Sequence, residues 1–217
     1  MAQPSFHRSG RSVRRARLRR TILVAVLGIA GIAFAVGRFT GGGEPEVPIA
    51  QVAFKTTVLG DGAPRPAKDA PAKEAKAVET LLNDYYQRAF VDPASFSDGA
   101  FPEVAERFAP EARDAFARDL KTLTIGEGAP DTARVDPETT TARITIYYEQ
   151  GKPSLATAAV RFIARARSKA KGAAPFRIDQ RATLHLRKDG DGWRIAYYVD
   201  ASQKQTTIAP SASPTTS

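Results

Sequence analysis

Alternation of apolar and polar residues over four segments of the C-terminal half constrains this chain more than any other feature. The segments cover 142–149, 158–167, 176–187 and 193–200. A period of two turns one set of side chains toward a core and the other toward water. Antiparallel sheets commonly have one packed and one wet face. The sequence therefore predicts a curved antiparallel sheet of four or more strands, with a hairpin turn in KDGDGW at 188–193.

The alternation also predicts the direction of individual side chains. In the last segment the core-facing residues are expected to be Trp193, Ile195, Tyr197 and Val199. Ile163 falls on the outward side of its strand, among polar neighbours.

Helical periodicity precedes these strands. Apolar residues spaced three and four apart predict a helix over about 72–90 with one apolar face. Prolines at 102 and 110 stand at plausible first-turn positions of two shorter helices. About three helices covering the apolar face of a following sheet make an α+β fold.

The N-terminal part contains a charge-free apolar run over 21–37, preceded by seven arginines. As a helix it reaches about 26 Å, slightly short of a hydrocarbon core of about 30 Å, and the flanking Arg20 and Arg38 can extend to the interfaces. A signal peptide usually has a shorter apolar region of about 7–15 residues, although the Ala-Phe-Ala at 33–35 is similar to a cleavage site. We expect a retained membrane helix, with a cleaved signal as the alternative.

The arginines also predict orientation. Positive charge stays on the cytoplasmic side, so we expect a single-pass protein of the cell membrane with an extracytoplasmic C-terminal domain. Contact with anionic lipid and a DNA-binding arm are two further interpretations of the arginine tail.

Composition divides the rest of the chain. Glycine and proline over 39–71 indicate a linker, within which residues 49–59 could form one short strand. The expected organisation is a cytoplasmic tail at 1–20, a transmembrane helix at 21–38, a flexible linker at 39–71, a folded domain at 72–201 and a disordered Ser/Thr/Pro tail at 202–217.

The order of elements over 72–201, ending in a strand that begins DGWRIAYYVD, resembles the nuclear transport factor 2-like superfamily, a cone of helices on a curved sheet. With its N-terminal anchor the chain is similar to two membrane groups. These are the mammalian-cell-entry (Mce) associated membrane proteins of actinobacteria and the bitopic scaffold subunits of type IV secretion and conjugation systems. The resemblance implies a non-catalytic domain that binds protein partners in an envelope transport or secretion assembly.

Eight arginines fall on outward positions of the predicted sheet, and we call this set the basic face. They are Arg143, Arg161, Arg165, Arg167, Arg177, Arg181, Arg187 and Arg194. With few acids to balance them, such side chains repel one another, which indicates an anionic partner. An acidic protein face, lipid headgroups and wall polymers are candidates, and an ordinary solvated surface is the alternative.

The charge distribution bears on the choice of partner. Residues 70–139 carry 14 acidic against 8 basic side chains. This acidic half of one copy could bind the basic face of a second copy, which would make a homo-oligomer. The basic face has few aromatic residues on which bases could stack, so nucleic acid is not expected.

Residues with catalytic chemistry form no recognisable motif, so no catalytic residue, metal or cofactor is expected. His185 falls on the outward side of its strand, while Gln180 is the polar residue on the apolar side of the same strand. The first predicted helix could bring Asp84, Tyr85 and Tyr86 to the mouth of the cone. Together with Gln180 they would form a ligand pocket, whereas a buried glutamine with tyrosine is more often a satisfied core network. A module binding a small apolar or lipid ligand is the alternative function, followed by an isomerase- or hydrolase-like enzyme.

Overall fold

The computed structural model describes residues 48–63, 67–96, 99, 101–126, 129, 131–190 and 192–209. The expected cytoplasmic tail and transmembrane helix, 1–38, lie outside these residues. Within the described part of the chain, no helix is long and apolar enough to cross a membrane.

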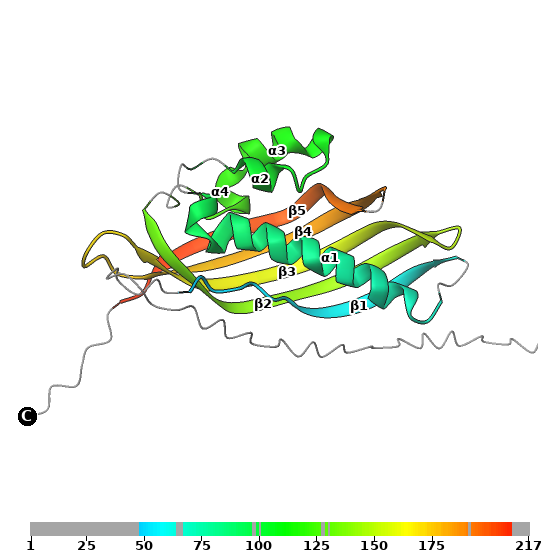
Figure 1. The fold of residues 1–217 in the computed structure, drawn as a ribbon, viewed down its shortest axis with the longest axis horizontal. Coiled ribbons are helices and arrows are strands. Elements are labelled where there is room, and N and C mark those ends of the chain that lie inside the picture. The colour runs from blue at the N-terminus through cyan, green and yellow to red at the C-terminus, as the bar shows by residue number, and fades with distance from the viewer. Residues whose placement is uncertain are drawn as a thin grey trace, which may run out of the picture.

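Five long strands form one sheet in sequence order, which confirms the α+β class (Figure 1). The strands are β1 Lys55–Ala63, β2 Thr132–Glu149, β3 Lys152–Ser168, β4 Phe176–Asp189 and β5 Gly192–Thr207. Strands β2 to β5 are antiparallel to their neighbours, whereas β1 runs parallel to β2 at the edge.

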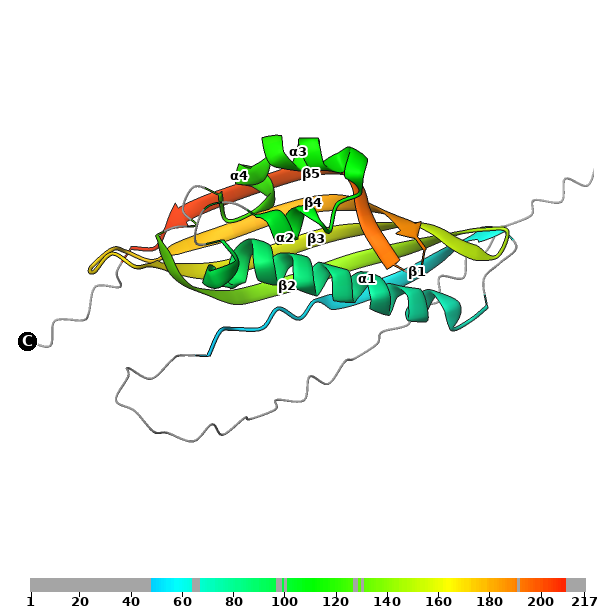
Figure 2. The same ribbon diagram turned by 45° about the horizontal axis from the view of Figure 1, so that its top comes forward.

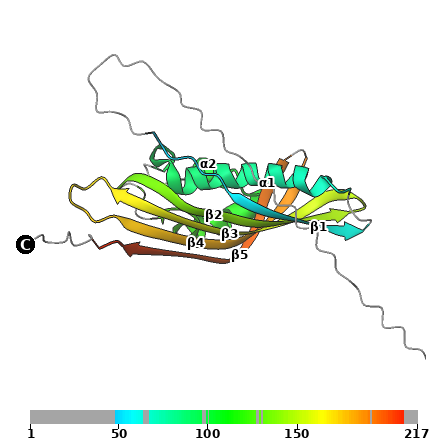
Figure 3. The ribbon, with the colours of Figure 1, turned by 90° about the horizontal axis from the view of Figure 1, so that it is seen from below.

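Short helices follow one long helix and lie on the same face of the sheet. They are α1 Ala70–Tyr86, a π-helical turn Gln87–Val91, a 3-10 turn Pro93–Ser95, α2 Pro102–Ala105, a 3-10 turn Pro110–Ala112, α3 Arg113–Arg118 and α4 Leu120–Leu123. Helix α1 runs along the strands, and α2, α3 and α4 group near β5 (Figure 2). The view from below shows α1 on one side of the strands only (Figure 3). We call the helix-covered face the inner face and the opposite one the outer face.

The core lies between the inner face and α1, and aromatic rings fill its centre. The Tyr86 ring lies 5.3 Å from Phe90 and 5.2 Å from Phe162 between ring centroids. All three side chains are fully buried. Rings packed at these distances gain more than their area burial alone supplies.

Residues 48–63 belong to the folded domain, so the expected linker at 39–71 is wrong over this part. The short strand expected within 49–59 is present and extends over Lys55–Ala63. Val52, Phe54 and Val58 are buried, and the backbone N–H of Phe54 donates to Oδ1 of Asn83 in α1 at 3.0 Å. Burial of these apolar side chains outweighs the Gly- and Pro-rich composition around them.

Strand β5 contains a bulge that overturns part of the alternation. Leu186 pairs with Ile195 and His185 pairs with Tyr197, so one extra residue stands in β5. An inserted residue reverses the side-chain directions that follow it. Tyr197 and Val199, expected in the core, are therefore 54% and 42% exposed.

The domain also ends later than expected. Strand β5 continues to Thr207, and its residues 202–207 pair with 176–181 of β4. The boundary expected at 201, where a disordered tail would begin, is therefore too early. Polar residues at 202–207 hide this strand from an analysis of hydrophobic periodicity, because pairing with β4 and not burial holds them in place.

Candidate interaction surface

The centre of the outer face carries four arginines from β3 and β4. Arg161 pairs in register with Arg181, and Arg165 pairs with Arg177. Their side chains are 47–58% exposed. Like charges at directly opposed positions repel each other, so this arrangement is stable only with counter-charge nearby.

Two carboxylates supply part of that counter-charge, contrary to the expectation of few balancing acids. Asp179 lies 3.6 Å from Arg161 and 3.5 Å from Arg181. Glu138 lies 3.4 Å from Arg165 and 3.8 Å from Arg177. Four guanidinium groups thus share two carboxylates, which leaves two positive charges in excess. Pairs this long and exposed each contribute only about 0–1 kcal/mol.

The other four arginines of the basic face differ from this centre. Arg187 pairs with Glu111 at 2.7 Å, and Arg194 pairs with Asp189 at 3.0 Å, so both are engaged near the helices that cover β5. Arg143 and Arg167 are exposed and form no ion pair with any residue that the structure describes. The basic face therefore has three parts. Four central arginines share two carboxylates, two arginines near β5 each have their own carboxylate, and two have no ion-pair partner among the described residues.

Apolar side chains lie beside this charge on the same outer face. Tyr147 and Leu155 pair in register on β2 and β3, and they are 37% and 51% exposed. His185 takes the outward direction expected from the sequence, and its ring stacks on Tyr197 at 4.1 Å between centroids. Burial lowers the pKa of His185 from its ordinary value. With Val199 these residues form the outer aromatic patch. Sequence reasoning missed Tyr197 and Val199, because the bulge in β5 turns these two outward.

Ile163 also lies on the outer side, as expected, yet its side chain is buried. It pairs with Asp179 and follows Arg161 by two residues along β3. Long arginine side chains lay their aliphatic stems over apolar neighbours while the charged heads stay in water. Ile163 is thus an apolar residue buried on the outer side, between Arg161 and Arg165 along β3.

The predicted inner site is densely packed. The Tyr86 hydroxyl donates to Oε1 of Gln180 at 2.7 Å, and the Tyr85 hydroxyl donates to the carbonyl oxygen of Leu123 at 2.5 Å. Burial raises the pKa of both phenols. These bonds agree with the core-network interpretation, and a ligand pocket built from these side chains gains no support.

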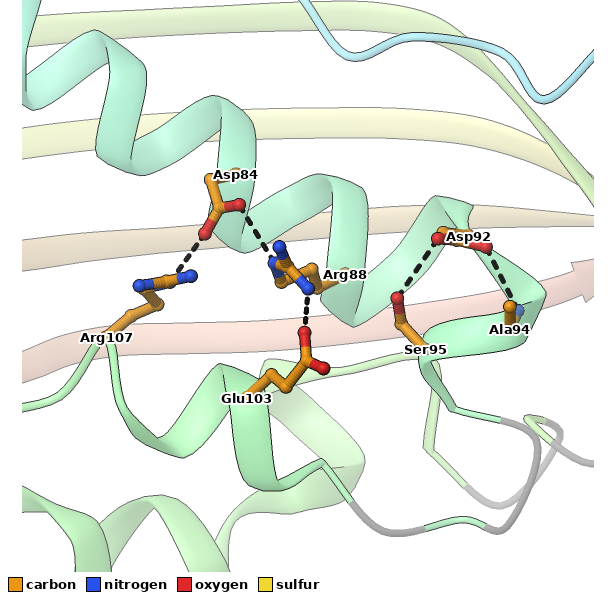
Figure 4. A network of polar contacts seen from close by, with 7 residues as sticks. All are labelled: Asp84, Arg88, Asp92, Ala94, Ser95, Glu103 and Arg107. Atoms are coloured by element: carbon orange, nitrogen blue, oxygen red, sulfur yellow. Dashed lines mark hydrogen bonds and ion pairs between the residues drawn. The ribbon is translucent and has the colours of Figure 1, made fainter.

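Asp84, the fourth residue of that predicted site, belongs to a surface network instead (Figure 4). Its carboxylate accepts from Arg88 at 2.9 Å and contacts Arg107. Arg88 also pairs with Glu103 of α2. These contacts join the end of α1 to α2 and the loop after it, and so position the short helices over β5.

Two hollows lie elsewhere on the described residues. One, of about 370 Å³, lies among residues that include Pro48, Val91 and Val135. The other, of about 510 Å³, lies on the outer face over β1, β2 and β3. In the described part of the chain, no group of three or more His, Asp or Glu side chains is placed to hold a metal ion.

Comparisons with known protein families and with curated proteins give no match, so function has to be inferred from the chemistry of these surfaces. No protein-family profile matches the sequence, and no curated protein gives a significant match. The outer face, with excess positive charge next to exposed aromatic residues, is the surface with the clearest interaction chemistry.

Proposed function

We propose that this chain is a single-pass membrane scaffold that uses the outer face of an extracytoplasmic domain to bind proteins of an envelope transport or secretion assembly. The observation that carries the proposal is the juxtaposition of the arginine centre with the outer aromatic patch. Arginine and tyrosine are enriched where proteins bind one another, because both combine apolar area with directed hydrogen bonds. An acidic partner surface would supply the counter-charge that Asp179 and Glu138 leave unmatched.

Tethering would make such contacts efficient. The structure describes the chain from residue 48, so at most residues 39–47 separate the domain from the predicted membrane helix. A chain of this length spans at most about 30 Å. The domain would therefore stay close to the bilayer, where its effective concentration for a neighbouring complex is high.

The proposal includes a nuclear transport factor 2-like cone without a catalytic role. In support, a long helix precedes short helices and a long, mostly antiparallel sheet. Gly192 and Trp193 of the DGW segment open β5, and the Trp193 indole N–H donates to Glu74 of α1 at 3.2 Å. The inner tyrosines and Gln180 form hydrogen bonds within the core. These bonds favour a partner-binding surface over a ligand site inside the domain.

The test replaces Arg161, Arg165 and Arg181 with glutamine in the full-length chain. The amount of partner protein captured with this variant from crosslinked membranes should fall to a small fraction of the wild-type amount, because the positive charge at the centre of the outer face has been removed. The matched control is the triple replacement of Lys73, Arg113 and Arg118, three exposed cations of the helices, by glutamine. Equal capture by both variants at unchanged circular dichroism would refute the proposal.

A further inference from the structure

The hollow over β1, β2 and β3 has a lining with only one sign of charge. Its charged residues are Lys55 of β1, Arg143 of β2 and Arg161 of β3, and no acidic residue lines it. Thr57 and Thr141 add hydroxyl groups to the same lining.

Strand register explains why these groups converge. Lys55, Thr141 and Arg161 occupy one row across the three strands. Thr57, Arg143 and Ala159 occupy the adjacent row. Neighbouring strands lie about 4.8 Å apart and successive outward residues about 6.6 Å apart, so Lys55 and Arg161 stand about 10 Å apart and Arg143 stands about 8 Å from each. Ala159 carries the shortest side chain in these two rows and also lines the hollow.

The three cations are poorly compensated within the described structure. Lys55 and Arg143 form no ion pair with a described residue. Arg161 has its ion-pair contact with Asp179 at 3.6 Å, a distance too long for a strong hydrogen bond. Three cations held this close repel one another, and an anion between them would relieve that repulsion.

We propose that this hollow, the β1–β3 hollow, binds a phosphate group. A carboxylate offers two acceptor oxygens in one plane, whereas phosphate offers acceptors in several directions and up to two charges. Arginine donates two parallel hydrogen bonds to phosphate oxygens, and lysine adds a point charge. A free phosphate ester and a phospholipid headgroup share this chemistry. The inference goes beyond the scaffold proposal, because a phosphate ligand here requires no protein partner.

Acetylation of Lys55, measured by mass spectrometry on the full-length chain in neutral detergent, tests the site with inorganic pyrophosphate as probe. Bound phosphate should slow acetylation of Lys55 at least about fivefold, since the bound anion covers the ammonium group. Lys204, exposed on β5 across the same sheet, should react at an unchanged rate. Arg143→Gln should abolish the protection of Lys55. Arg167→Gln, which removes the other unpaired outward arginine, should keep it.

Nanodiscs distinguish the two sources of phosphate. Protection of Lys55 by pyrophosphate supports a free phosphate ester. Protection in phosphatidylglycerol but not phosphatidylcholine discs, lost in Arg143→Gln, supports a lipid headgroup. An unchanged Lys55 rate in both arms, equal protection of Lys204, or protection that survives Arg143→Gln overturns the inference. Arg161 lines the hollow and is also replaced in the capture experiment, so the two proposals are separated by Arg143→Gln, which leaves Arg161, Arg165 and Arg181 in place and should keep protein capture.

Discussion

Glu74 connects the long helix to the last hairpin. Its Oε2 accepts from Lys188 Nζ at 2.7 Å and from the Trp193 indole at 3.2 Å. The charged side chains are only 18% and 22% exposed, and the Lys188 ammonium lies 5.2 Å from the centre of the Trp193 ring. One carboxylate thus compensates a cation and an indole N–H that are both largely withdrawn from water.

Glu74→Ala should lower the free energy of unfolding by about 1–3 kcal/mol, because it leaves two partly buried donors without their acceptor. Urea denaturation of the full-length chain measures this change. The control is Glu111→Ala, which removes a pair with Arg187 whose two side chains are about half exposed, and should cost less than about 1 kcal/mol. Equal losses for the two variants would contradict the role assigned to Glu74.

His185 makes a second residue-scale prediction, which concerns pH. Its pKa is lowered because burial disfavours the charged imidazole. The unfolded chain then takes up the proton first, so this contribution to stability falls as the pH drops below about 6.5 and levels off below the folded pKa. Tyr197→Ala uncovers the ring and should raise the pKa of His185 toward its ordinary value. An NMR titration would exclude this account if Tyr197→Ala left the pKa of His185 unchanged.

At the scale of elements, the segment 48–54 that precedes β1 is part of the folded domain. The rings of Phe54 and Tyr86 form a T-shaped pair with 5.0 Å between their centroids. Phe54→Ala should therefore destabilise the fold by about 3–5 kcal/mol, as loss of a buried aromatic side chain usually does. Ile49→Ala, at a position 47% exposed, should change stability by less than about 0.5 kcal/mol. Chemical denaturation with equal midpoints for both variants would mean that this segment is not part of the core.

Periodicity predicted the sheet, the long helix and the outward direction of the arginines on β2, β3 and β4. It failed in β5 because Tyr197, Tyr198 and Val199 are all apolar, so no residue there reveals the extra residue of the bulge. The parallel pairing of β1 with β2 joins segments separated by all the helices. Such pairing depends on tertiary packing, which local composition does not report.

The site shows the same division between local and long-range information. Parity along single strands is local, and it gives the outward positions of the basic face. Of the two carboxylates that balance the centre, Asp179 stands two residues from Arg181 on the same strand, whereas Glu138 reaches Arg165 from the neighbouring strand β2. Likewise, Lys55 joins Arg143 only through the register of β1 with β2. The residual charge and the hollow therefore required the folded arrangement.

For the whole molecule, charge divides between the two sides of the sheet. Helix-side acids such as Asp84, Glu103 and Glu111 engage arginines within the domain. The outer face keeps excess positive charge and exposed aromatic rings. A membrane-tethered domain with this asymmetry would present its outer face, and not its helices, to partners.

Photocrosslinking in intact cells tests that central claim most directly. A benzoylphenylalanine replaces Tyr197 on the outer face in one variant and Lys76, whose side chain is 72% exposed on α1, in another. The outer-face variant should give a crosslinked protein of defined mass, and the helix variant should give none. Adducts from position 76 alone, or no adduct from position 197 in a chain that remains folded, would contradict the account.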